Sequence, residues 1–141
     1  MCGLAGYFGK TKSTTEIERD LLNMGKVIEH RGPDDSGIWH REGVHSIGLV
    51  HRRLSILDLS KSGHQPMTSR NERYVVSYNG EIYNHLELRQ LIDKKTHSKY
   101  KWRGYSDTET LLACLEIFGV EGTLNRLVGM FAFALWDCKC N

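Results

Sequence analysis

Cys2 is the residue with the clearest potential for chemistry, because it directly follows the initiator methionine. A small residue at this position normally permits removal of Met1, which would make Cys2 the true N-terminus. A free α-amino group titrates at about 7.7 to 8.0, so near neutral pH part of it can accept a proton from a neighbouring thiol. One residue would then supply both nucleophile and general base. The alternative is an accidental cysteine, and only motifs elsewhere can decide between the two.

Charge and length restrict the class of protein. The 141 residues include 19 basic and 17 acidic side chains, a formal net charge of +2, and 40% are hydrophobic. This favours one domain with one core, and the balanced charge argues against nucleic acid or an anionic membrane surface as a partner. Residues 1–15 lack the order of a signal peptide and no apolar run could span a bilayer. We therefore expect a cytoplasmic protein that acts on a small molecule or a protein.

The cysteines argue against a disulfide or metal framework. The chain has Cys2, Cys114, Cys138 and Cys140, of which one lies in a predicted helix and two are separated by a single residue. This pattern fits a reducing compartment. Cys138 and Cys140 would supply only two metal ligands, so we expect no metal site.

Hydrophobic periodicity and turn residues divide the chain into strands and helices. Residues 13–16 and 106–109 have capping-box spacing, and each precedes apolar residues at helical intervals. The Asn79-Gly80 dipeptide suits positive φ and is predicted as a tight turn between strand and helix. Residues 58–71 are polar and predict a long surface loop. The predicted elements are a strand at 3–8, a helix at 15–29, a hairpin of 36–40 and 44–54, a strand at 74–78, a helix at 84–94, a helix from 107 to 119, a short helical segment near 121–128, and a strand at 130–136 covered on both faces.

Seven motifs follow one another across almost the whole chain. They are Met-Cys-Gly at 1–3, His-Arg-Gly-Pro-Asp-Asp-Ser-Gly at 30–37, His-Arg-Arg-Leu-Ser-Ile at 51–56, Gly-His-Gln-Pro-Met at 63–67, Tyr-Asn-Gly-Glu-Ile-Tyr-Asn at 78–84, Ser-Asp-Thr-Glu at 106–109, and the strand and its flanks at 129–137. In this order they resemble the glutaminase domain of glutamine-hydrolysing asparagine synthetase. The motif at 78–84 and the last strand look more like that enzyme than like glucosamine-phosphate synthase or the purine-pathway amidotransferase.

The resemblance implies a fold and an activity. The fold is α+β, the four-layer αββα sandwich of two antiparallel sheets found in N-terminal nucleophile hydrolases. Residues 1–141 would form a class II glutamine amidotransferase (glutaminase) domain. In this family the cysteine attacks the side-chain amide of glutamine to give a thioester and ammonia, and water then releases glutamate. The full-length family enzyme uses the ammonia to make asparagine from aspartate and ATP.

The resemblance also implies which residues act on the amide and the carboxylate. Cys2 matches the nucleophile, and its α-amine matches the base, acting through a water. Asn79 and Gly80 match the oxyanion hole, for which a side-chain N–H and a backbone N–H are suitable donors. Arg53 matches the partner of the glutamine α-carboxylate, a task suited to a forked guanidinium. The adjacent Arg52 could be mistaken for this residue, but strand alternation sends the two side chains to opposite faces, and the motif alignment selects Arg53.

The α-ammonium group of the substrate glutamine requires negatively charged partners. Glu81 and Asp107 match its acceptors in the family, although alone Asp107 would be a helix cap and Glu81 a solvated charge. The family pattern also brings the backbone around Leu54, Ile56 and Leu57 to the substrate. No cofactor is expected in this chain, because ATP and magnesium belong to the synthetase domain.

Two features depart from the family. Its sequences continue beyond residue 137 with further strands and a large ATP-dependent synthetase domain, so we expect a C-terminally truncated glutaminase domain that lacks its last strands. Residues 138–141 also differ from the family's polar turn. The apolar edge at 130–136 then favours self-association, or pairing with a synthetase domain or subunit. An inactive fragment that binds glutamine or a partner protein is the alternative function. His30 and Arg31 are expected to be scaffold, while His51 has no assigned chemistry.

Overall fold

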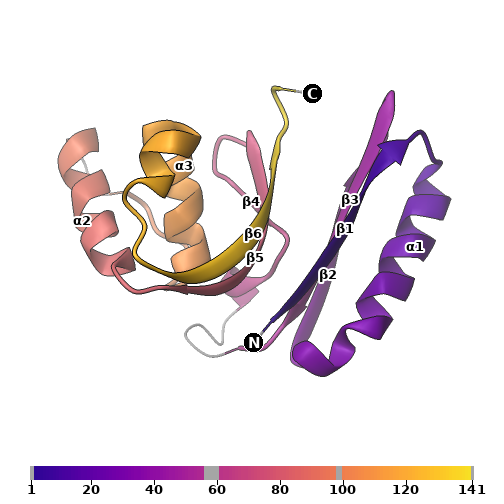
Figure 1. Ribbon diagram of the computed structural model, residues 1–141. Coiled ribbons are helices and arrows are strands. Elements are labelled where there is room, and N and C mark those ends of the chain that lie inside the picture. The colour runs from indigo at the N-terminus through magenta and orange to yellow at the C-terminus, as the bar shows by residue number, and fades with distance from the viewer. Residues whose placement is uncertain (1, 56–60, 98–99, 141) are drawn as a thin grey trace.

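The computed structural model describes residues 2–55, 61–97 and 100–140. Two antiparallel three-stranded sheets face each other, and helices cover the outer face of each (Figure 1). This is the αββα sandwich that the resemblance implied, so the predicted fold class is confirmed. The described elements are β1 (Gly3–Lys10), α1 (Thr14–Val27), η1 (Glu29–Arg31), β2 (Asp35–Arg41), β3 (His45–Arg53), η2 (Lys61–Gly63), β4 (Met67–Thr68), β5 (Tyr74–Ile82), α2 (His85–Thr96), α3 (Asp107–Leu124) and β6 (Gly129–Asp137).

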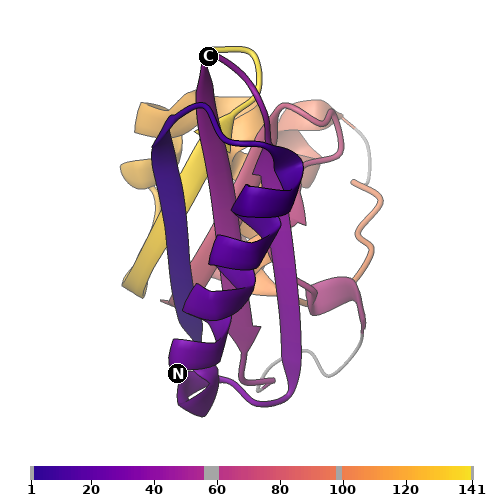
Figure 2. The ribbon, with the colours of Figure 1, turned by 90° about the vertical axis from the view of Figure 1, so that its right-hand side faces the viewer.

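The first sheet has the order β1-β3-β2, and α1 lies across its outer face (Figure 2). The helix begins at a complete capping box, in which Ser13 accepts from the N–H of Glu16 and the Glu16 carboxylate accepts from the N–H of Ser13. Its apolar side packs on β3, where Ile17 and Leu21 are buried against Val50. The helix, the hairpin and the N-terminal strand predicted from the sequence are all confirmed, although α1 ends before η1.

The second sheet has the order β4-β5-β6 and corrects the predicted turn at Asn79-Gly80. Both residues lie inside β5, which continues to Ile82 because β6 pairs along its whole length. The positive φ of Gly80, 150°, agrees with the sequence. Its role is close strand packing, since a Cβ there would lie 2.4 Å from Cα of Phe131. The chain turns instead at residues 83–84.

The larger core lies between β5 and the helices α2 and α3. Alternate side chains of β5 meet the buried faces of the two helices. Its members include Tyr74, Val76, Tyr78, Ile82, Leu88, Ile92, Leu111, Leu112 and Leu115. Gly119 has φ 71° and ψ 179°, which kinks α3 at the predicted helix end. None of the helices in the described part of the chain is both long and apolar enough to cross a bilayer.

Two other predictions need correction. Strand β6 is only half covered: Phe131, Phe133 and Leu135 pack against the larger core, but Met130 is 69% exposed. The prediction that both faces of this strand are covered is therefore wrong, because the larger core covers one face and Met130, on the other face, is open to solvent. The described part of the predicted loop at 58–71 contains η2 and the short strand β4, which pairs with β5.

Candidate functional site

Of the residues assigned by resemblance, those that the structure describes gather at one end of the two sheets. Cys2 precedes β1, Arg53 ends β3, and Asn79 and Gly80 lie near the end of β5. Strands β1 and β5 have these ends at the lower side of Figure 1, near the N-terminus. Asp107 opens α3 and reaches the same end of β5 through a hydrogen bond described below.

Cys2 is held by backbone groups at the end of β3. The N–H of Leu54 donates to the Cys2 sulfur at 3.3 Å. The Cys2 thiol in turn donates to the carbonyl oxygen of Leu54 at 3.6 Å. On the other side, Nε of Arg31 donates to the Cys2 carbonyl at 3.1 Å. Leu54, one of the predicted substrate-contacting residues, thus touches the predicted nucleophile, whereas Ile56 and Leu57 lie outside the described residues.

The two adjacent arginines of β3 point to opposite sides of the sheet. Arg52 faces α1, where it donates to the carbonyl of Gly25 at 3.0 Å and pairs with Glu29 at 3.3 Å. Arg53 is buried on the other side, packed so closely on Gly63 that a Cβ there would lie 2.1 Å from Nη2. The alternation expected from the sequence is therefore present, and Arg53 lies between the two sheets.

The side chain of Asn79, one of the two predicted oxyanion donors, is on the face of β5 that meets the first sheet. The hydroxyl of Ser77 donates to the carbonyl of Val50 at 3.5 Å, which identifies the face of β5 that meets β3. By alternation, Asn79 shares this face, whereas Tyr78 points toward α3. Asn79 is partly exposed and Glu81 is exposed, so both are open to solvent at the end of the strand.

Asp107 is more deeply engaged than a helix cap. Its Oδ2 accepts from the hydroxyl of Tyr78 at 2.7 Å and from the N–H of Ile82 at 3.0 Å. Burial, followed by the charge of Asp107, raises the pKa of Tyr78 far above its usual range, so the phenol stays protonated and donates. The cap itself is made by Ser106, which accepts from the N–H of Thr108 at 3.1 Å. Asp107 therefore ties α3 to β5, and its Oδ1 makes no hydrogen bond with any described residue.

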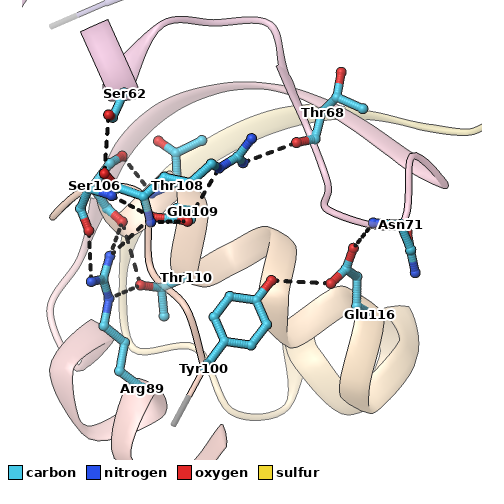
Figure 3. Close-up of polar contacts among 12 residues, drawn as sticks. Ser62, Thr68, Asn71, Arg89, Tyr100, Ser106, Thr108, Glu109, Thr110 and Glu116 are labelled. Atoms are coloured by element: carbon cyan, nitrogen blue, oxygen red, sulfur yellow. Dashed lines mark hydrogen bonds and ion pairs between the residues drawn. The ribbon is translucent and has the colours of Figure 1, made fainter. Parts of the chain in front are cut away.

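The second predicted capping box is incomplete, because Glu109 faces the preceding loop. Its carboxylate is 3% exposed and accepts from the N–H of Arg103 at 2.8 Å and of Gly104 at 3.0 Å. From α2, Arg89 donates to the carbonyls of Gly104 and Ser106, each at 2.9 Å (Figure 3). The start of α3, and with it Asp107, is thereby fixed by an acid and a base from different helices.

Sequence reasoning missed two buried polar residues beside the predicted site. His51 lies two residues before Arg53 on the same face of β3, and its Nε2 contacts the carbonyl of Tyr78 at 2.9 Å. Gln65 accepts from the N–H of Tyr78 at 2.7 Å and donates to the hydroxyl of Thr108 at 3.3 Å. Burial lowers the pKa of His51 to about 4, so the ring is neutral near pH 7. The shared face of His51 and Arg53 is the one sequence signal that could have identified it.

A pocket of about 240 Å³ lies at the opposite end of the sandwich. It is separated from the predicted site by the length of β1, since Lys10 pairs with His45 there and Gly3 pairs with Arg52 at the other end. Its lining consists of Phe8, Arg41, Glu42, Gly43, Val44, His45, Ile47 and Trp136. None of the residues assigned by resemblance belongs to it.

Comparisons with known proteins agree with the fold. A solved structure of glutamine phosphoribosylpyrophosphate amidotransferase from Bacillus subtilis, a complex with ADP and GMP, superposes with a TM-score of 0.65. The match covers 94% of this chain and 35% of that one at 17% identity, so it shows the fold alone.

Two curated relatives are named as glutamine-hydrolysing asparagine synthetases. Asparagine synthetase 1 of Bacillus subtilis is 41% identical over 139 residues, which are 97% of this chain and 21% of the relative. Asparagine synthetase B of Escherichia coli is 38% identical over 139 residues, 99% of this chain and 24% of the relative. The chain thus spans about a quarter of the length of these relatives. Since the model of the glutamine amidotransferase domain matches residues 1–141, the chain belongs to that family.

Proposed function

We propose that this chain hydrolyses the side-chain amide of glutamine to glutamate and ammonia, with Cys2 as the nucleophile. The observation that carries this proposal is the position of the Cys2 thiol beside the end of β3. Its sulfur accepts a hydrogen bond from the N–H of Leu54 at 3.3 Å. The proposal is also supported by Asn79, whose side chain is on the face of β5 that meets the first sheet. A nucleophile and two donors on facing strands are suited to acyl transfer.

The reaction proceeds in two steps. After removal of Met1, the α-amine of Cys2 takes the thiol proton through a water while sulfur attacks the amide carbon. The negative charge that develops on the amide oxygen is stabilised by the side chain of Asn79 and the N–H of Gly80. The carbon–nitrogen bond then breaks, the proton goes to the leaving nitrogen, and ammonia departs. Water attacks the resulting thioester, which releases glutamate and restores the thiol.

Charged side chains from both sheets bind the amino-acid end of glutamine. Arg53 pairs with the α-carboxylate from the first sheet. Glu81 from β5 and Asp107 from the start of α3 accept hydrogen bonds from the α-ammonium. Oδ1 of Asp107 makes no hydrogen bond with any described residue that would compete. The backbone around Leu54, together with Ile56 and Leu57, completes the contacts.

The ammonia is consumed by a larger assembly. Because the curated relatives named above are asparagine synthetases about four times as long, we assign this chain to the glutaminase part of such an enzyme. A synthetase domain or subunit would supply ATP and magnesium, and the glutaminase chemistry itself requires no cofactor. We place the protein in the cytoplasm, where glutamine and reducing conditions are available.

The direct test uses protein whose loss of Met1 has been verified by intact mass. Incubation with glutamine is expected to yield glutamate and ammonia in equal amounts. Protein that retains Met1 should be inactive, because its Cys2 has no free α-amine. Glutamine binding without turnover in the processed protein would instead indicate a binding module.

A further inference from the structure

Tyr78 is held by hydrogen bonds at all three of its polar groups. Its N–H donates to Oε1 of Gln65 at 2.7 Å, its carbonyl contacts Nε2 of His51 at 2.9 Å, and its hydroxyl donates to Asp107 at 2.7 Å. All four residues are buried. The two backbone bonds are made to side chains, although Tyr78 lies in the central strand of a sheet.

The short strand β4 explains why side chains take this role. In the described register, Met67 pairs with Val76 and Thr68 with Val75, so β4 does not reach Tyr78. Extending that register by two residues places Gln65 opposite Tyr78. Buried backbone groups need hydrogen-bond partners. Gln65 and His51 therefore satisfy backbone groups that a longer strand would otherwise have paired.

These bonds determine the orientation of the peptides that lead to the predicted oxyanion donors. The carbonyl of Tyr78 and the N–H of Asn79 belong to one planar peptide unit, so a bond to that carbonyl also orients Asn79. The N–H of Tyr78 belongs to the preceding unit, which Gln65 orients in the same way. Both peptides that flank Tyr78 are thereby fixed immediately before Asn79 and Gly80.

His51 is suited to hold this peptide permanently. A carbonyl only accepts, so Nε2 of His51 carries the proton and donates. The ring is neutral near pH 7 and Nε2 holds its single proton, so Nδ1, which is buried and makes no hydrogen bond with any described residue, carries none. His51 belongs to β3, three residues before Leu54, whose N–H contacts the Cys2 sulfur. One side chain thus connects the strand that ends beside the nucleophile with the strand that carries the donors.

We propose that His51 and Gln65 are positioning residues, which align Asn79 and Gly80 with the developing oxyanion by fixing the peptides on either side of Tyr78. This inference rests on the proposed function. An oxyanion donor acts only when it is about 2.7 to 3.1 Å from the charge, and a displacement of about 1 Å can cost on the order of 100-fold in rate. Neither side chain contacts the reacting atoms.

Steady-state glutaminase kinetics of processed protein test the proposal with matched pairs. His51→Leu removes the donor and is expected to lower kcat roughly 10- to 100-fold while KM changes less than about threefold. His51→Gln retains an amide N–H near the position of Nε2 and should recover most of that loss. Gln65→Met removes the acceptor for the N–H of Tyr78 in a side chain of similar shape and should lower kcat. Gln65→Glu keeps an acceptor for this N–H and should retain more of the activity. His40→Leu, on the outer strand β2, should leave kcat unchanged.

A double-mutant cycle separates positioning from general destabilisation. If His51 aligns Asn79 and Gly80, His51→Leu should lower kcat by a clearly smaller factor when Asn79 is already alanine, because only Gly80 is then left to misalign. If His51→Leu lowers kcat by the same factor with Asn79 present and with Asn79→Ala, and the wild type is active, the positioning role is wrong while the proposed function stands. Inactive wild-type protein would overturn the proposed function and this inference together. Circular dichroism checks folding; if His51→Leu unfolds, the Gln65 pair gives the same test, and unfolding of both would overturn the proposal.

Discussion

The first sheet holds Cys2 and Arg53 at the end of one strand, whereas the second sheet holds its predicted site residues through a buried polar network. Cys2 depends on backbone groups of Leu54 and on Arg31. On the second sheet, side chains from β3, from the loop before β4 and from the start of α3 hold Tyr78. Both sets of contacts join residues distant in sequence, but the nucleophile is held mainly through backbone groups, whereas the strand that carries the donors is held through several buried side chains. Substitutions should therefore act sharply on the first sheet and in graded steps on the second.

The largest effect is expected at the nucleophile. Cys2→Ala should abolish glutamine hydrolysis and leave glutamine binding largely intact, because the thiol makes the bond and other residues hold the substrate. Glutamate release and calorimetric binding measure the two properties separately. Cys140→Ala, at an exposed position, is the matched control and should retain activity. Glutamine turnover by Cys2→Ala at the wild-type rate would contradict the proposed mechanism.

Loss of a donor on the second sheet should come next. Asn79→Ala is expected to lower kcat by about 10² to 10³, with a much smaller change in KM, because an oxyanion donor acts on the transition state. The control Asn125→Ala, at an exposed helix end, should leave kcat and KM unchanged. If Asn79→Ala instead raised KM at constant kcat, Asn79 would be a substrate contact.

The contact between the sheets should make stability depend on pH. The folded pKa of His51, about 4, lies below its unfolded value, so the unfolded chain binds more protons as pH falls below about 6.5. Stability should fall by on the order of 2 kcal/mol from pH 7 to pH 5 on account of His51, and level off below about pH 4. Burial also lowers the pKa of His85, which adds to the same trend.

Urea unfolding at pH 7 and pH 5 measures this dependence. His51→Gln has no group that titrates at this site and should show a weaker dependence. The ion pair of Arg73 and Asp137 does not interfere, because it holds the pKa of Asp137 at about 2 and is lost only in stronger acid. An equal pH dependence in wild type and His51→Gln would contradict the prediction.

The smallest effect compares the two faces of β3. Arg53→Lys should raise KM for glutamine by about tenfold, because lysine cannot form the bidentate bond to a carboxylate. Arg52→Lys, on the side of α1, should leave KM unchanged and lower only the melting temperature. Equal changes in KM for both variants would mean that Arg53 has no special role.

Local signals predicted the elements of the first sheet well. The capping box at residues 13–16 and the alternation of Arg52 and Arg53 depend on neighbours in sequence, and both are present. The described residues that the family motifs select lie at one end of the sandwich. Their individual roles stay predictions until the variants above are measured.

Features that depend on distant partners could not be predicted. Asn79-Gly80 reads as a turn, yet pairing with β6 extends the strand through it. Glu109 has capping-box spacing, but the buried N–H groups of the preceding loop compete for its carboxylate. The contact of His51 spans 27 residues and exists only because the two sheets face each other.

Gly80 and Gly119 both have positive φ, but they should differ as sites of natural variation. At Gly119, with φ 71° and ψ 179°, a Cβ would meet nothing within 4 Å, so replacement meets backbone strain alone, about 1 to 3 kcal/mol in a region that strongly favours glycine. At Gly80 the first carbon of any side chain already collides with the backbone of β6. Alanine is therefore excluded at position 80 as firmly as tryptophan, and homologous sequences should carry a side chain at position 119 more often than at position 80.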